Sequence, residues 1–380
     1  MATTDRPIII YHYTFSPYAR RITWYLTLRG IPFTECLQPP ILPRPDVNSL
    51  GISYRRIPIV SIGRDIYLDT RLQLLKLEES PHLSSISPPL APTAESGCRA
   101  SIPDTRLMTR LLESWCIDSG LMSVAASLIP LDFPLMKDPK FLKDRAELRS
   151  APSWPPPDSS SPGAEKKPSP EAQAQAAKVR RAESLQEAKS AFQLLEDTVF
   201  NDGREWIVSG TNFPTVADIE AVWLFHWLII GMPAALDTSD GAPFVTEEEF
   251  PRVFAWVRRF DALINEKKKE KNRTPKRVKG EEARRLILGS LWNEEEKGVE
   301  KGVDEKDSLV QALGLRKGDE VVVHPTDTGK NHKDVGRLVK MDSEEVVWEV
   351  KTKEEGEAVR VHAPRHGFRV RNGETSVGKL

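Results

Sequence analysis

The stretch from Ile8 to Arg21 constrains the fold more than any other part of this 380-residue sequence. Its apolar start predicts a buried strand, because strands covered on both faces are continuously apolar. Ser16 is a good N-cap, and Pro17 fits the first helical position, where its missing N–H costs nothing. The helix is expected to end at Gly30. A strand therefore leads directly into a helix N-terminus, and such an end favours anions through its unpaired N–H groups and its dipole.

The rest of residues 1–80 predicts a small mixed sheet. The expected strands cover residues 32–37, 57–62 and 66–68. A helix follows Asp69 and Thr70, either of which can cap it. The order β-α-β followed by β-β-α is that of the thioredoxin class, so we predict an α/β thioredoxin-like domain over residues 1–80.

The middle of the chain predicts an all-helical domain. Residues 81–103 are rich in Ser and Pro and indicate a linker, and residues 104–295 show helical periodicity. Within that domain, the low-complexity run at 150–170 predicts a disordered insertion. Thr215 and Asp218 have the spacing of a capping box. The helix that they start is apolar on nearly all sides, so we expect it to be buried.

The last part of the chain changes character. Short β-prone runs recur between residues 310 and 375, and Gly and Asp residues separate them. This pattern predicts a separate small all-β, barrel-like domain.

Composition limits the function classes. A formal net charge of −1 argues against a body built for nucleic acid or an anionic membrane. The three cysteines, Cys36, Cys98 and Cys116, show no CxxC spacing, which fits a reducing compartment and no metal cluster. No secretory signal is visible, and the apolar run from Val222 to Met232 is too short to span a bilayer. We therefore expect a soluble cytoplasmic protein without a metal.

Three motifs carry a resemblance to cytosolic glutathione transferases. Ser-Pro-Tyr-Ala-Arg-Arg at 16–21 resembles the start of helix 1 in the serine- and cysteine-type classes. Arg56-Ile57-Pro58-Ile59-Val60 is similar to the strand that holds a cis-proline in the family, and Asp69-Thr70 stands where the family usually has Glu/Asp-Ser. Thr215 to Asp218 resembles the capping motif of its all-helical second domain. The resemblance covers roughly the first 265 residues; with the β tail added, the chain is similar to fungal transferase-like proteins.

The resemblance implies a site for glutathione as co-substrate. Ser16 would donate its hydroxyl to the glutathione sulfur, and the backbone of Ile57, before Pro58, would pair with the cysteinyl part. Asp69 would face the γ-glutamyl ammonium, and Thr70 would take the neighbouring carboxylate. Arg56 would hold the glycine carboxylate.

The thiolate donor stays open at this point. Tyr18 flanks the sulfur position, as do Tyr11 and Tyr13, so a tyrosine could replace Ser16 as the donor. Lowering the pKa of a thiol by about two units requires roughly 2.7 kcal/mol of differential stabilisation, so one hydroxyl would need help.

The resemblance implies conjugation, or related isomerisation, of a small hydrophobic electrophile in an apolar cleft between the domains. It also implies a homodimer. The alternative is a non-catalytic scaffold that acts through its β tail and the segment 266–285, which carries ten Lys/Arg against four Glu. We interpret that segment chiefly as a solvated surface, and a nucleic-acid partner is not expected.

Overall fold

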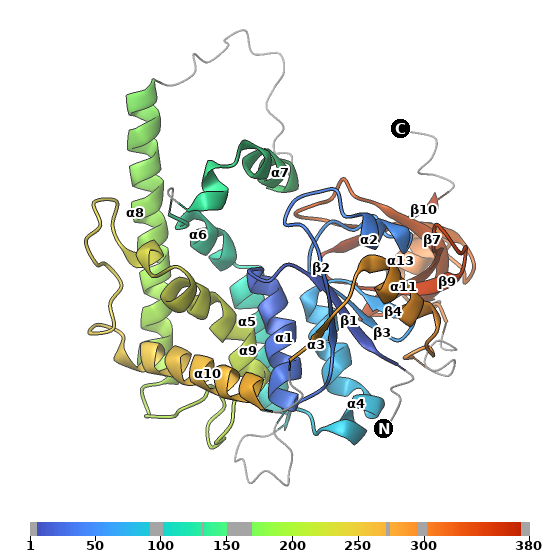
Figure 1. Ribbon diagram of the computed structural model, residues 1–380, viewed down its shortest axis with the longest axis horizontal. Helices are drawn as coiled ribbons and strands as arrows, with labels where there is room; N and C mark the ends of the chain where they lie inside the picture. Colours follow the sequence, from blue (N-terminus) through green and yellow to red (C-terminus); the bar gives the residue numbers. More distant parts are fainter. Residues whose placement is uncertain are drawn as a thin grey trace.

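The computed structural model describes residues 6–91, 102–130, 133–149, 169–270, 274–294 and 302–373. A group of helices forms one side of the molecule and a ten-stranded sheet forms the other (Figure 1). The strand order is β10-β6-β7-β8-β9-β4-β3-β1-β2-β5. No helix in the described ranges is both long and apolar enough to cross a lipid bilayer.

The N-terminal elements have the thioredoxin-like arrangement that the sequence predicts. They are β1 (Ile8–His12), α1 (Pro17–Arg29), β2 (Thr34–Leu37), α2 (Pro45–Ser49), β3 (Ile59–Ile62), β4 (Asp65–Tyr67), α3 (Thr70–Glu79) and α4 (Pro81–Ile86). Strand β1 pairs with β2 in parallel and with β3 in antiparallel orientation. Ser16 caps α1, and Gly30 ends that helix with a positive φ of 65°. The predicted linker at 81–103 begins with the short helix α4; its residues 92–101 lie outside the described ranges.

The helical part is built around a buried central helix. It comprises α5 (Ile102–Ile117), α6 (Leu121–Ser127), α7 (Pro139–Arg149), α8 (Pro170–Leu194), α9 (Val216–His226) and α10 (Pro251–Lys269). Thr215 and Asp218 form the predicted capping box, with the Thr215 amide donating to Asp218 Oδ2 at 2.9 Å. Every residue of α9 from Ala217 to His226 is buried, as its apolar composition predicts. The predicted insertion falls almost wholly outside the described ranges, at residues 150–168.

The C-terminal β region is confirmed, but it is joined to the N-terminal sheet instead of standing apart. Its elements are α13 (Ser308–Leu313), β6 (Glu320–Pro325), β7 (Asp334–Met341), β8 (Glu345–Lys351), β9 (Ala358–Pro364) and β10 (Phe368–Asn372). Strand β9 pairs in parallel with β4, with Ile66 opposite Val361. Tyr11 of β1 and Trp348 of β8 share one buried apolar cluster. An edge strand offers unpaired N–H and C=O groups, and β9 satisfies those of β4.

Residues 274–294 also differ from the prediction of an all-helical domain over 104–295. Strand β5 (Lys276–Arg277) pairs with β2, and α11 (Gly280–Leu288) buries Ala283 and Ile287 in the apolar cluster of the sheet. This segment therefore belongs to the sheet side of the molecule. Several of its cations form ion pairs, namely Lys276 with Glu282, Arg277 with Glu35, and Arg284 with Glu354 and Glu355.

Candidate functional site

The predicted site residues converge because two helices begin beside the end of one strand. In the β1–β3 ladder, Tyr11 lies opposite Ile59, so the chain before β3 runs beside the turn that enters α1. The side-chain Nε2 of Gln73, in α3, donates a hydrogen bond to the carbonyl oxygen of Pro58 at 2.9 Å. The peptide bond between Ile57 and Pro58 is cis, as the resemblance implies. The N-termini of α1 and α3 therefore both lie close to the Ile57–Pro58 segment.

Ser16 sits at the first of these helix ends. The residue is 1% exposed, and its Oγ accepts a hydrogen bond from the backbone amide of Ala19 at 3.3 Å. A hydroxyl that accepts one hydrogen bond still carries a proton to donate. Ser16 is thus both a helix cap and a potential donor at an electropositive helix end.

The three candidate tyrosines occupy different places, and Tyr13 is half-buried with its ring centroid 4.7 Å from that of Phe15. Tyr18 is half-buried against Trp223, with 4.9 Å between ring centroids. Burial raises the pKa of Tyr18 to about 12, although Arg21 and Arg56 lower it in part, so the phenol stays protonated at neutral pH. Tyr11 faces the opposite side of the sheet and is fully buried in the cluster shared with the C-terminal region. Tyr11 therefore cannot act at the N-terminus of α1.

Asp69 caps α3 from an unusual backbone conformation. Its φ is 65°, and its carboxylate accepts a hydrogen bond from the amide of Arg71 at 3.1 Å. Two guanidinium groups also lie near that carboxylate, those of Arg56 at 3.6 Å and Arg71 at 3.8 Å. Burial alone would raise the pKa of Asp69, but the two arginines outweigh it and hold that pKa below its usual value. Asp69 is thus an ionised carboxylate at the predicted site, although cations of the protein already face it.

Thr70 is held by an ion pair that the sequence reasoning did not identify. The residue is 4% exposed, and its hydroxyl accepts a hydrogen bond from the guanidinium of Arg21. Arg21 in turn pairs with Glu220 of α9. Helix α9 has two acidic residues, and Asp218 serves in the capping box, so Glu220 needs another buried partner and was a usable signal.

Arg56 contacts the C-terminal β region, which the sequence could not show. Its Nη1 lies 3.1 Å from Oδ1 of Asp327, in the connection between β6 and β7. Its guanidinium carbon lies 5.3 Å from the ring centroid of Tyr54 and 5.4 Å from that of Phe368 in β10. The cation assigned to the glycine carboxylate is therefore already paired with carboxylates of the protein.

The backbone of Ile57 remains available. The residue is half-buried, and within the described ranges no hydrogen bond is found for its N–H or its carbonyl oxygen. The backbone N–H of Thr70 is likewise without a hydrogen-bond partner in those ranges. Unpaired backbone groups beside two helix N-termini suit an extended peptide with a carboxylate.

Helix α7 links the helical part to the loop that follows β2 (Figure 1). Its Asp144 accepts a hydrogen bond from the amide of Leu42 at 3.1 Å and pairs with Arg55 at 2.8 Å. The carbonyl oxygen of Leu148 accepts a hydrogen bond from the amide of Gly329, in the β6–β7 connection, at 3.0 Å. The end of α7 and the β6–β7 connection thus meet beside Arg55 and Arg56.

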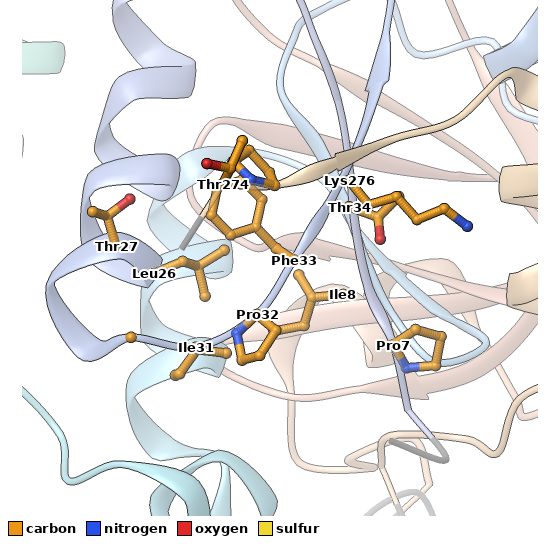
Figure 2. A pocket seen from close by; sticks show the side chains of 12 residues that line it. Pro7, Ile8, Leu26, Thr27, Ile31, Pro32, Phe33, Thr34, Thr274 and Lys276 are labelled. Carbon is orange, nitrogen blue, oxygen red and sulfur yellow. The ribbon is translucent and has the colours of Figure 1, made fainter. Parts of the chain in front are cut away.

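One cavity of the described structure lies away from these residues. Its volume is about 230 Å³, and Leu26, Ile31 and Phe33 line it together with residues 274–276 (Figure 2). These positions surround the C-terminal end of α1, whereas Ser16 is at the N-terminal end. The cavity therefore does not coincide with the electrophile cleft that the resemblance implies.

The cysteines offer no alternative nucleophile among the described residues. Cys36 and Cys116 are both buried free thiols. Burial raises the pKa of Cys36 to about 12 and also raises that of Cys116. Cys98 lies outside the described ranges.

Comparisons with known proteins agree with this architecture. Residues 10–84 match the family model of the glutathione S-transferase N-terminal domain, and residues 164–269 match that of the domain of unknown function DUF7962. A glutathione S-transferase-like protein from Pseudomonas syringae has a similar structure, with 20% identity, a TM-score of 0.57, and coverage of 96% of this chain and 99% of that one. A search of curated proteins gave no match.

Two plant glutathione transferase structures also match this chain, with lower scores. A tau-class glutathione S-transferase from mango has 14% identity and a TM-score of 0.43, with coverage of 74% of this chain and 98% of that one. A rice transferase solved with glutathione has 16% identity and a TM-score of 0.43, with coverage of 74% and 96%. The bacterial structure spans nearly the whole chain, so the shared fold includes the C-terminal β region.

Proposed function

We propose that this chain, a glutathione transferase-like protein, binds glutathione and presents its thiolate to a small hydrophobic electrophile. The observation that carries the proposal is the backbone of Ile57, a half-buried residue beside the N-termini of α1 and α3, whose N–H and carbonyl oxygen have no hydrogen-bond partner in the described ranges. An extended peptide that paired with Ile57 would place a sulfur near one helix end and a carboxylate near the other.

Ser16 would donate its hydroxyl to the sulfur, and the N-terminus of α1 would add its dipole. A thiol with a pKa near 8.5 is mostly protonated at neutral pH, so both effects favour the reactive thiolate. A helix N-terminus contributes typically about 0.3–1 kcal/mol and a hydrogen bond to an ion about 1.5–3 kcal/mol. Together they contribute about 1.8–4 kcal/mol, a range that includes the roughly 2.7 kcal/mol that a shift of two pKa units requires. Tyr18 remains the alternative donor, because it stays protonated and lies near Arg56 and Asp69.

The remaining groups would hold the ends of the tripeptide. Asp69 would face the γ-glutamyl ammonium, and the N–H of Thr70 would hold the neighbouring carboxylate. Arg56 would contact the glycine carboxylate.

In the reaction, the sulfur electron pair would form a C–S bond to the electrophilic carbon. The leaving group would depart with the electrons of the broken bond, and the thiol proton would pass to solvent. Isomerisation would use the same thiolate, which would add to the substrate and later leave. A homodimer and a cytoplasmic location remain parts of this proposal.

Titration calorimetry with glutathione, followed by turnover of 1-chloro-2,4-dinitrobenzene, tests the proposal. We expect Ser16→Ala to retain binding and to lose at least tenfold in kcat. The matched control is Ser80→Ala, because Ser80 caps α4 through the amide of Leu83 in the same way. We expect each variant to lose about 1 kcal/mol of stability because it lacks a helix cap, and only Ser16→Ala to lose turnover.

Other outcomes have defined meanings. Unchanged turnover in Ser16→Ala with loss in Tyr18→Phe would move the donor role to Tyr18. Absence of glutathione binding at millimolar concentration would refute the enzyme and leave the scaffold interpretation.

A further inference from the structure

The C-terminal β region reaches the proposed glutathione site through the connection between β6 and β7. Both carboxylate oxygens of Asp327 lie within hydrogen-bond distance of Arg56 Nη1, at 3.1 and 3.2 Å. The backbone amide of Gly329, two residues later, donates a hydrogen bond to the carbonyl oxygen of Leu148 at 3.0 Å. The connection is therefore anchored while Asp327 faces Arg56.

Arg56 has little room for a further carboxylate. Its side chain is 19% exposed, with aromatic rings from Tyr54 and Phe368 near its guanidinium. Asp69 approaches the same guanidinium at 3.6 Å. Two carboxylates thus already offset the single positive charge of Arg56.

The side chain of Asp327 can leave its ion pair with Arg56 more easily than that of Asp69. The side chain of Asp327 is 60% exposed, whereas that of Asp69 is 9% exposed. Moving an exposed carboxylate from an ion pair into water costs little, because such pairs contribute typically about 0.2–1 kcal/mol. A ligand carboxylate could therefore replace Asp327 at Arg56. The binding free energy would then gain only the difference between the ion pair of Arg56 with the ligand and the ion pair of Arg56 with Asp327.

We propose that Asp327 is a specificity-determining residue that competes with the glycine carboxylate of glutathione for Arg56. It weakens the binding of thiols that carry this carboxylate and leaves the binding of thiols without it unchanged. The inference rests on the proposed function, because it needs glutathione at this site.

Calorimetry with two ligands and three forms of the full chain tests the inference. The ligands are glutathione and its glycine monoethyl ester, which has no charge at that position. The forms are the wild type, Asp327→Asn and the control Glu357→Gln. Glu357 is 51% exposed and pairs with Arg64 at 3.0 Å, so the control also loses one carboxylate of an exposed pair from the same β region.

We expect Asp327→Asn to bind glutathione about 1.5- to fivefold more tightly and the ester unchanged, since the free energy of an exposed ion pair corresponds to that factor. Glu357→Gln should match the wild type with both ligands. In an Arg56→Gln background, Asp327→Asn should have no effect on either ligand.

Equal affinity of wild type and Asp327→Asn for glutathione would overturn the inference and leave the proposed function intact. An equal gain for the ester would also overturn it, because the effect would then not involve the glycine carboxylate. If no form binds either ligand, the proposed function itself fails.

Discussion

Arg21 of α1 and Glu220 of α9 form an ion pair in which both side chains are excluded from solvent, at 0% and 1% exposed. The pair joins the thioredoxin-like part to the helical part, and Arg21 also donates to the hydroxyl of Thr70. Burial raises the pKa of Glu220, and the positive charge of Arg21 counteracts this. The pair holds the Arg21 side chain in place, and its hydrogen bond to Thr70 links α1 to α3, the two helices whose N-termini form the proposed site.

Arg21→Met should destabilise the protein strongly, because it leaves Glu220 buried without a counter-charge. We expect a loss of about 3–5 kcal/mol in the free energy of unfolding, measured by urea denaturation. The double variant Arg21→Met/Glu220→Met should lose less than the single variant, since no charge is left buried. The control Arg258→Met removes an exposed ion pair with Glu247 and should change stability by less than about 1 kcal/mol. A small effect of Arg21→Met would contradict this role.

Asp69→Asn should separate ligand binding from folding. Asn caps helices as well as Asp and tolerates the positive φ of 65° at this position. We therefore expect an unchanged fold and a loss of at least tenfold in affinity for glutathione, measured by calorimetry. Asp307→Asn is the matched control, because Asp307 caps α13 and pairs with Arg365 away from the site. Equal affinities of the two variants for glutathione would show that Asp69 does not contribute to binding.

His362 should make stability depend on alkaline pH. It is fully buried, with Nε2 2.9 Å from Asp65 and Nδ1 3.1 Å from Glu345. Burial alone would lower the pKa of His362, but Glu294, Asp65 and Glu345 outweigh it and raise that pKa to about 9. A raised pKa means that the stabilisation is fully present below the unfolded value near 6.5 and is lost as the pH rises through about 9.

The measurement is the free energy of unfolding at pH 6.5 and at pH 9.5. We expect His362→Gln to be less stable than the wild type at pH 6.5. The difference between their free energies of unfolding should shrink by an amount on the order of 3 kcal/mol at pH 9.5. The control is His366→Gln, whose side chain is 68% exposed. A gap that stayed constant with pH would show that His362 is neutral in the folded protein.

Gly63→Ala should displace the segment that follows α11. The φ of Gly63 is 58°, and an added Cβ would lie 2.1 Å from the carbonyl oxygen of Leu291. Gly314 has a similar φ of 63° with no atom within 4 Å of an added Cβ, so Gly314→Ala measures the backbone cost alone. We expect roughly 1 kcal/mol for Gly314→Ala and at least about 2 kcal/mol more for Gly63→Ala in thermal or urea unfolding. Equal losses would mean that the 289–294 segment adjusts without cost.

The sequence by itself determined the local structure. The cap at Ser16, the stop at Gly30 and the capping box of Thr215 and Asp218 are all present where they were predicted. Each depends on hydrogen bonds between residues within about four positions of one another, so residue type and spacing are sufficient. The same local signals placed Ser16, Ile57 and Thr70 near helix ends and a strand end.

Only the tertiary structure decided how the distant parts meet. The pairing of β9 with β4, the contact of Asp327 with Arg56 and the docking of 274–294 on the sheet join residues that are far apart in sequence. An edge strand can pair with any strand whose register and side chains fit, and an arginine can pair with any carboxylate within reach. The local sequence pattern therefore does not identify the partner strand or the partner carboxylate. These contacts decide which groups remain free for a ligand.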